Sequence, residues 1–343
     1  MKAVVLKDFG GPENLVVTEV PTPRVEDLGE GEVLLRVGAV GVCYHDIINR
    51  RGDLPRTKLP AILGHEIAGE VIGIGPRSER FSTGDHVATV QRVHCSDCLL
   101  CDSGRPTLCK DGAFFGEEIP GGYAEFVVAQ EHALSQVPAE LPLEEASIAA
   151  CTIGTAIHVV NRGKVQPGES VLITGASGGV GLHMIQVCKL AGARVIAATS
   201  SPRKEHGLYD AGADEVVVSP DLDFSPAVKQ LTGGRGVDVA IEITGAFTFD
   251  ASVRSLAPGG RLVMVGSLET RSVSFLPGLM ILKELEFIGS FATTTAELAE
   301  AFRLITDGKV RPVVSEVMSL DDAAHAHRML FDRQITGRVV LRI

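Results

Sequence analysis

The sequence predicts a two-domain α/β protein, in which a β-rich N-terminal part precedes a doubly wound parallel sheet. The first 150 residues alternate short β-forming runs with Gly and Pro turns and carry few helical signals. From about residue 150, strands alternate with helical patterns, which is typical of right-handed βαβ units around a parallel sheet. A length of 343 residues suits two domains of ordinary size.

Composition disfavours several classes of protein. The chain is 45% hydrophobic and 22% charged, as ordinary soluble domains are, and its net charge is −11. This acidic balance disfavours nucleic acid and anionic membranes as partners. The N-terminus has too short an apolar run for a signal peptide, and no stretch approaches the roughly 18 apolar residues of a membrane span. We therefore expect a cytoplasmic protein that acts on a small molecule.

The N-terminal part is predicted to be a rolled antiparallel β domain. Its strand signals are "GEVLLRVGAVGVC" (31–43), "GEVIGIG" (69–75), "GDHVATV" (84–90) and "GGYAEFVVA" (121–129). In the second part, "DEVVVS", "VDVAIEI" and "GRLVMVG" predict further strands, and "TAELAEAFRLITDG" and "LDDAAHAHRMLF" predict helices. A final strand, "GRVVLRI", closes the chain.

One loop inside the β domain holds four of the seven cysteines, Cys95, Cys98, Cys101 and Cys109. In a reducing cytosol, clustered cysteines are more often metal ligands than disulfides. The spacing suits a closed tetrahedral zinc site, with an iron–sulfur cluster and disulfides as the alternatives. The ferredoxin run ends with a three-residue gap and Cys-Pro, whereas here the last gap is seven residues and Lys110 follows. A closed site has no position for substrate, so this loop is predicted to be scaffold.

A Gly-rich turn, "TGASGGVG" (174–181), lies between a strand and a helix of one βαβ unit. Glycines there permit a tight turn and let a pyrophosphate approach the helix N-terminus. The alternative is a Gly-rich turn that binds nothing. We predict dinucleotide contacts from Gly175, Gly178, Gly179 and Val180.

The next strand ends "AATSSPRK" (197–204), without the Asp or Glu that an NAD site usually places there. Hydroxyl and cationic groups favour a ribose 2′-phosphate at this point. The residues concerned are Thr199, Ser200, Arg203 and Lys204. A solvated helix start is the alternative reading. We predict that NADP(H) is preferred over NAD(H).

A second metal site has weaker support from spacing. "GVCYHDII" supplies Cys43, "LGHEIAGEV" supplies His65, and "AACTIGTA" supplies Cys151, where the β domain gives way to the α/β domain. Two cysteines and one histidine with an open fourth position form a known catalytic zinc arrangement. Such separations are not in themselves a metal signature, and a lone cysteine is more often a small buried hydrophobe. Both readings stay open from the residues alone.

The order of several motifs along the chain adds support for the second metal site. "GHEIAGEV", "GDHVATV", the four-cysteine loop, "GGYAEFV" and "TGASGGVG" occur in the order found in zinc-containing medium-chain dehydrogenase/reductases, which the chain resembles over nearly its whole length. The resemblance implies a GroES-like β domain and a Rossmann domain. Residues 1–150 would form the catalytic domain with its Cys₄ lobe at 95–109, residues 151–289 the dinucleotide-binding domain, and residues 290–343 a return to the catalytic domain. A homodimer or homotetramer is also implied.

The same resemblance assigns roles to residues and implies two zinc ions per chain. Cys43, His65 and Cys151 match the catalytic zinc ligands. Glu66 matches an acid close to the metal, and Asp46 matches the carboxylate that orients the histidine ligand. The expected cofactor contacts are Thr155 beside the nicotinamide, Thr244, Gly266 and Ser267 at strand ends, and Arg338 at the pyrophosphate.

One position departs from the family pattern. Alcohol dehydrogenases of the family usually carry Ser or Thr two residues after the first cysteine ligand, and this chain has His45 in "CYHD". An imidazole there could relay a proton, or it could be a packed or solvated side chain. "CYHD", "CTIGTA", "TGASGGVG" and "TGAFTFDASVRSLAPGGRLVMVGS" also resemble a zinc-containing subgroup that reduces acryloyl-CoA.

The sequence therefore predicts a zinc-dependent oxidoreductase that transfers hydride between NADP(H) and a zinc-held alcohol, aldehyde or ketone. The enzymatic alternative is reduction of an activated C=C bond, as in acryloyl-CoA or another enoyl-CoA. A non-catalytic NADPH-binding protein is the third possibility, which the presence of all three candidate zinc ligands disfavours.

Overall fold

The computed structural model describes all residues 1–343 and divides into two compact units. The first unit comprises residues 1–154, 292–308 and 312–343, and the second comprises residues 155–291 and 309–311. The expected boundaries, 150/151 and 289/290, differ from these by a few residues. The final part of the chain thus belongs mainly to the unit that contains the N-terminus.

The first unit contains a seven-stranded sheet and a three-stranded sheet. The larger has the order β15-β16-β3-β5-β6-β8, with β7 paired to β3, and the smaller has the order β2-β1-β4. The strands are β1 Lys2–Leu6, β2 Leu15–Glu19, β3 Glu32–Val42, β4 Ala61–Ile62, β5 Glu66–Ile74, β6 His86–Thr89, β7 Phe126–Gln130, β8 Leu134–Gln136, β15 Val314–Ser319 and β16 Arg338–Arg342. All four strand signals of the N-terminal part and the closing strand are confirmed.

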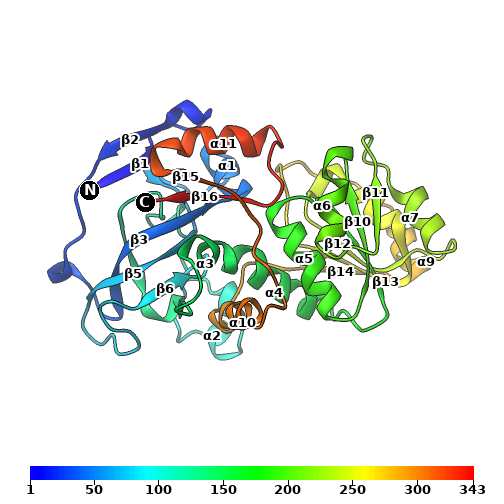
Figure 1. Cartoon of the computed structure of the whole chain (residues 1–343). Helices are drawn as coiled ribbons and strands as arrows, with labels where there is room; N and C mark the ends of the chain where they lie inside the picture. The colour runs from blue at the N-terminus through cyan, green and yellow to red at the C-terminus, as the bar shows by residue number, and fades with distance from the viewer. The chain divides into compact units, whose positions relative to one another are not determined.

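The last strand pairs with the strand that leads into the site. β16 is antiparallel to β3, with Val339 opposite Val42, and Figure 1 shows the two strands side by side. The helices of this unit are α1 Tyr44–Arg51, α2 Leu99–Asp102, α3 Leu143–Ala149, α10 Thr295–Thr306 and α11 Ala323–Phe331. The C-terminal segment therefore carries α11 and Arg338 into the same unit as Cys43.

The second unit contains a parallel six-stranded sheet of order β11-β10-β9-β12-β13-β14. Its strands are β9 Ser170–Ile173, β10 Arg194–Thr199, β11 Glu215–Val218, β12 Val237–Glu242, β13 Leu256–Met264 and β14 Glu286–Gly289. Its helices are α4 Thr155–Arg162, α5 Gly179–Leu190, α6 Glu205–Asp210, α7 Ser225–Leu231, α8 Phe249–Ser255 and α9 Pro277–Lys283. The strand order reverses between β9 and β12, and ligands of such sheets bind beyond the strand ends at this point.

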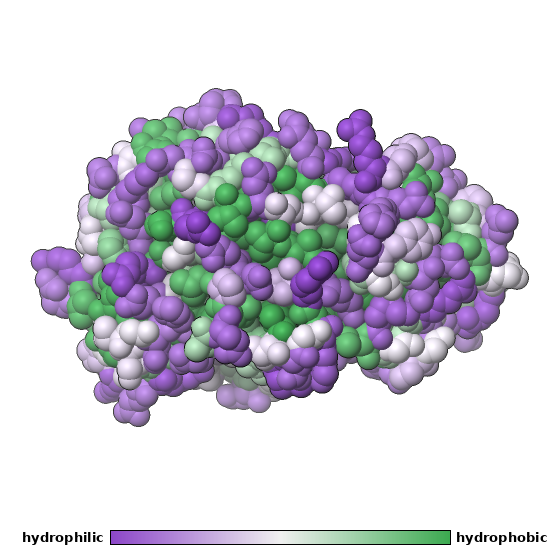
Figure 2. Space-filling view, viewed as in Figure 1, coloured by the Kyte–Doolittle hydropathy of each residue, from purple (hydrophilic) through white to green (hydrophobic).

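One helical segment, Leu143–Arg162, is long and apolar enough by composition to cross a membrane. Its burial within the protein, 61% of the most apolar window, is that of a core helix. Figure 2 shows a face on which hydrophilic residues are interspersed with apolar ones.

Candidate active site and metal centres

The four cysteines of the 95–109 loop converge. Their sulfurs lie 3.9 Å apart for Cys95 and Cys101, 3.5 Å for Cys98 and Cys101, and 3.4 Å for Cys95 and Cys109. These separations are too long for disulfides, and all seven cysteines are free. A tetrahedral zinc ion with Zn–S bonds of about 2.3 Å places its sulfurs about 3.8 Å apart. The cluster therefore fits a closed zinc site.

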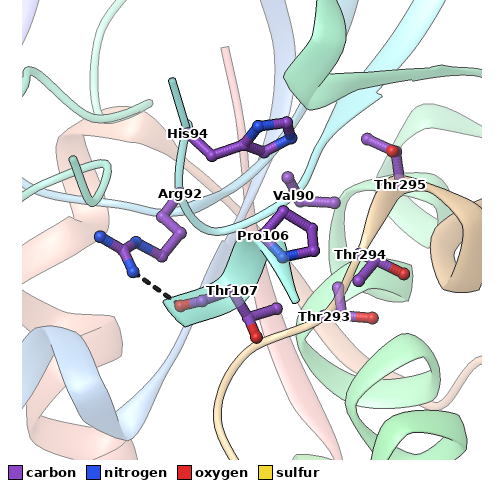
Figure 3. A pocket seen from close by; sticks show the side chains of 8 residues that line it. All are labelled: Val90, Arg92, His94, Pro106, Thr107, Thr293, Thr294 and Thr295. Carbon is purple, nitrogen blue, oxygen red and sulfur yellow. Dashed lines mark hydrogen bonds between the residues drawn. The ribbon is translucent and has the colours of Figure 1, made fainter. Parts of the chain in front are cut away.

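A small pocket lies beside this lobe. Figure 3 shows it lined by Val90, Arg92, His94, Pro106, Thr107 and Thr293 to Thr295. The Arg92 guanidinium donates to the Thr107 carbonyl at 2.6 Å and to the Cys109 carbonyl at 2.9 Å. The one strong cation of the pocket thus holds the cysteine loop together.

The second cluster gathers side chains from three separate elements of the first unit. Cys43 is the N-cap of α1, where its backbone N–H donates to the Asp46 carboxylate at 2.9 Å. His65 directly precedes β5, and Cys151 lies in a π-helical turn, Ala150–Gly154, that follows α3. Such turns recur at functional sites because the extra residue redirects a side chain.

Ligand atoms of Cys43, His65, Glu66 and Cys151 all lie within 4.8 Å of one another. The Cys43 and Cys151 sulfurs are 3.9 Å apart, and all four residues are buried. Two thiols and an imidazole are the donors that zinc prefers, and a tetrahedral ion requires this sulfur separation. The residues present therefore fit a zinc ion.

Arg338 lies in this cluster, which was not expected. Its Nη2 donates to Glu66 Oε1 at 2.5 Å and lies 3.3 Å from the Cys43 sulfur and 3.5 Å from the Cys151 sulfur. The family resemblance implies a contact between Arg338 and the cofactor pyrophosphate, and that contact stays a prediction. What the structure shows is a fully buried ion pair with Glu66.

The electrostatics of the cluster favour a thiolate at Cys43. The pKa of the Cys43 thiol lies well below its usual range, because Cys151 donates a hydrogen bond to it and Arg338 adds positive charge. Burial raises the pKa of Glu66 to about 7, although Arg338 opposes the rise. A thiolate thus faces the position where the donor atoms meet, and the Glu66 carboxyl group is paired with Arg338.

His65 is oriented from behind by a carboxylate. Its Nδ1 lies 3.1 Å from Asp46 Oδ1, and both residues are fully buried. Burial raises the pKa of Asp46, but the His65 charge outweighs burial and holds that pKa below its ordinary value. Asp46 therefore accepts from Nδ1, and a metal ion could take the place of the proton on Nε2.

His45 lies next to this site. Its ring contacts the His65 ring at 5.1 Å and the Phe114 ring at 4.8 Å between centroids. Nε2 of His45 lies 3.1 Å from Glu117 Oε1, and Nδ1 is buried without a hydrogen-bond partner. The imidazole thus pairs with a carboxylate, and its side chain is 29% exposed.

The dinucleotide turn has the backbone geometry that its glycines predict. Gly175 has φ +56°, and a Cβ on Gly181 would lie 2.5 Å from the Gly175 carbonyl oxygen. α5 begins at Gly179 with Gly178 as its N-cap, and Val180 lies in its first turn. Free N–H groups at this helix start suit a phosphate.

Glu242, which the sequence analysis overlooked, ties this turn together. Its buried carboxylate accepts hydrogen bonds from Thr174 Oγ1, the Thr244 N–H and the Gly245 N–H, each at 2.8 to 2.9 Å. The hydroxyls of Thr248 and Ser252 donate to its second oxygen. It thereby links the end of β9 to the turn after β12, where Thr244 lies.

The other predicted cofactor residues lie in the second unit at the following places. Thr155 starts α4 and is buried, while Gly266 and Ser267 follow β13. A Cβ on Gly266 would lie 2.3 Å from the Ile243 carbonyl oxygen, so this crossing requires glycine. Thr199 ends β10, Ser200 and Lys204 are half-buried, and Arg203 is exposed.

Comparisons with known proteins match both units. Residues 29–139 match the alcohol dehydrogenase GroES-like domain, and residues 179–307 match the zinc-binding dehydrogenase family. An acryloyl-coenzyme A reductase of Metallosphaera sedula is 35% identical over 99% of both chains. An alcohol dehydrogenase of Geobacillus stearothermophilus is 33% identical over 100% of both. The crystal structure of AibC is 58% identical with a TM-score of 0.92, covering 100% of this chain and 95% of that one.

Proposed function

The chain belongs to the zinc-containing medium-chain dehydrogenase/reductases, and we propose on that premise that it reduces the activated C=C bond of an enoyl thioester with NADPH. In this reaction the nicotinamide C4 hydride adds to the β-carbon and a proton adds to the α-carbon. The electron pair of the C=C bond passes through the thioester carbonyl and returns to form the α-C–H bond. The cofactor supplies the hydride, and the chain supplies position and charge.

The choice of C=C reduction over carbonyl reduction rests mainly on the imidazole of His45. A proton that must reach carbon needs a fixed acid, and the Glu117 carboxylate at 3.1 Å holds the His45 ring in one orientation. Family alcohol dehydrogenases place a hydroxyl there, which passes a proton from oxygen to solvent. The full-length similarity to an acryloyl-coenzyme A reductase supports the same choice. Both observations reverse the order of the two activities that the sequence alone predicted.

Cys43, His65 and Cys151 would hold the zinc ion. A zinc ion at this position supplies Lewis acidity toward a carbonyl oxygen. Asp46 orients His65, and Arg338 pairs with Glu66, so that the buried carboxylate stays hydrogen-bonded beside the thiolates. With zinc bound, this side of the site would therefore stabilise a substrate carbonyl oxygen that gains negative charge.

Oxidation of an alcohol, or reduction of an aldehyde or ketone, is the second candidate. The Cys₂His donor set favours it, because that set is a known alcohol dehydrogenase arrangement. A relative at 33% identity over the full length also has this activity by name.

A substrate comparison tests the choice. We expect NADPH oxidation with crotonyl-CoA or acryloyl-CoA at a kcat/KM at least about 100-fold above that with benzaldehyde or cyclohexanone. His45→Asn should lower kcat with the thioester by about 100-fold, the usual contribution of a positioned acid. The matched control is His206→Asn, at an exposed histidine of α6. Turnover of carbonyl compounds alone would overturn the proposal.

We also propose that NADP(H) is the preferred cofactor. β10 ends without an acidic side chain, and Ser200, Arg203 and Lys204 follow it. Arg203→Ala should raise the KM for NADPH about 10-fold and leave the KM for NADH unchanged, because only NADPH carries the 2′-phosphate. Equal specificity constants for the two cofactors in the wild-type enzyme would contradict this preference.

We propose a cytoplasmic homo-oligomer. Free thiols in two metal-type clusters are typical of a reducing compartment. Leu276, the N-cap of α9, and Ile281 and Leu282 within α9 are each at least 75% exposed. A second copy of the chain would cover these side chains.

A further inference from the structure

A row of buried polar side chains continues from His65 past Asp46 to α11. Tyr123 Oη lies 3.4 Å from Asp46 Oδ2, and His327 Nε2 lies 3.0 Å from the same Tyr123 oxygen. All four side chains are at most 1% exposed. A buried hydroxyl and a buried imidazole are costly unless they are hydrogen-bonded, so this arrangement is specific rather than incidental.

The hydrogen bonds in this row have one direction. The Asp46 carboxylate accepts from the Cys43 N–H, from His65 Nδ1 and from the Tyr123 hydroxyl. Because Tyr123 has one proton, which goes to Asp46, its oxygen accepts from His327 Nε2. Every donor therefore points toward the Asp46 carboxylate, and His65 keeps its proton on Nδ1.

His327 is suited to this donor role because it stays neutral. Burial lowers its pKa to about 4, and the nearby charge of Arg50 contributes, although Asp46 opposes the shift. Its Nδ1 is buried and has no hydrogen-bond partner in the protein, which agrees with a proton on Nε2. The tautomer follows from the network, not from observed hydrogens.

The backbone is built around the Tyr123 ring. The N–H groups of Gly122 and Tyr123 donate to the Gly64 and Leu63 carbonyls at 2.8 and 3.0 Å. Gly64, directly before His65, has φ +94°, and a Cβ there would lie 2.5 Å from the ring. The Tyr123 side chain and the His65 backbone thus occupy positions that depend on each other.

We propose that Tyr123 and His327 are positioning residues that hold Asp46, and through it His65, in the geometry that retains the metal ion. This inference rests on the proposed metal site at Cys43, His65 and Cys151. It makes metal retention depend on α11, a helix of the C-terminal segment that packs against α1 (Figure 1).

Metal release tests the proposal without any turnover assay. Purified enzyme is mixed with 4-(2-pyridylazo)resorcinol, and zinc transfer is followed for the wild type, Tyr123→Phe and His327→Leu. We expect two zinc ions per chain, with release from the catalytic site about 10-fold faster in both variants and release from the Cys₄ lobe unchanged. His327→Gln, which keeps an N–H near the Nε2 position, should restore most of the retention.

Cobalt substitution adds a second readout. Cobalt in place of the catalytic zinc should show shifted d–d bands in Tyr123→Phe and wild-type bands in His325→Gln, an exposed control on the same helix. Circular dichroism identifies any variant that fails to fold. Wild-type release rates and cobalt spectra in both Tyr123→Phe and His327→Leu would overturn the inference alone. One zinc per chain in the active wild-type enzyme would overturn the proposed function as well.

Discussion

Cys43 and Arg338 are 295 residues apart in the chain, yet their side chains are 3.3 Å apart. The guanidinium contacts both thiols and Glu66, so it balances the negative charge of a buried site. Local motifs predicted Cys43, His65 and Cys151 as one set of ligands, and the structure brings their side chains together. The Arg338 contact was not predicted, because a C-terminal arginine carries no local signal of its partner.

Cys151 and Cys188 make a matched pair of buried cysteines. Cys151→Ala should remove one metal ligand, lower the zinc content from about two to about one per chain, and reduce turnover at least about 100-fold. Cys188→Ala, in the core of α5, should cost about 1 kcal/mol of stability and leave zinc content and kcat unchanged. Metal analysis and steady-state kinetics check both. Wild-type turnover in Cys151→Ala would show that the cluster is not the active site.

His327 predicts an acid-sensitive contribution to stability. Its pKa is about 4 in the folded protein and about 6.5 when unfolded, so the unfolded chain takes up the proton first. Its contribution is complete above pH 6.5 and is lost as the pH falls to 4, by about 3 kcal/mol. Urea unfolding at pH 7, 5 and 4 should show a smaller loss in His327→Gln. Equal losses in both proteins would contradict this assignment.

At the scale of elements, the period-two and helical patterns predicted most of the fold. The closing strand 337–343 and the helices at 295–308 and 320–331 are confirmed as β16, α10 and α11. The short helix α1 was not expected. It begins at a capping box formed by Cys43 and Asp46, and it ends at Gly52. The π-helical turn at Cys151 was also missed, since it depends on tertiary contacts such as Gln91 Nε2 to the Ala150 carbonyl at 3.4 Å.

The turn between β12 and α8 depends on one carboxylate. Glu242→Gln replaces one oxygen of Glu242 by an NH₂ group that faces the Thr248 and Ser252 hydroxyls. We expect a loss of about 1–3 kcal/mol in the free energy of unfolding, because these hydroxyls are buried and lose a charged acceptor. Guanidinium unfolding measures the loss, with exposed Glu286→Gln as the control. Equal stability of the two variants would show that the carboxylate is dispensable.

At the scale of the whole molecule, the C-terminal segment completes the first unit, since β16 pairs with β3 and α11 packs near α1. It places Arg338 beside Cys43 and His327 beside Tyr123. Sequence motifs cannot place such residues, because the pairing of β16 with β3 joins positions about 300 residues apart and depends on the complete fold.

The exposed apolar face of α9 predicts an assembly of copies of the chain. Leu282 is 85% exposed and Ile281 is 75% exposed, on a helix that packs against β13, the neighbour of the edge strand β14. Light scattering of the wild type should give the mass of a dimer or tetramer, and Ile281→Glu with Leu282→Glu should lower it. Exposed Leu190→Glu, on α5, is the control. A monomeric wild type at micromolar concentration would contradict the prediction.

The central claim is that Cys43, His65 and Cys151 hold a metal ion that the reaction requires. Anomalous diffraction above and below the zinc absorption edge, from crystals of fully active enzyme, tests it most directly. The account predicts two peaks per chain, one amid the four sulfurs of the 95–109 lobe and one between Cys43, His65 and Cys151. A single peak, at the lobe alone, would contradict it.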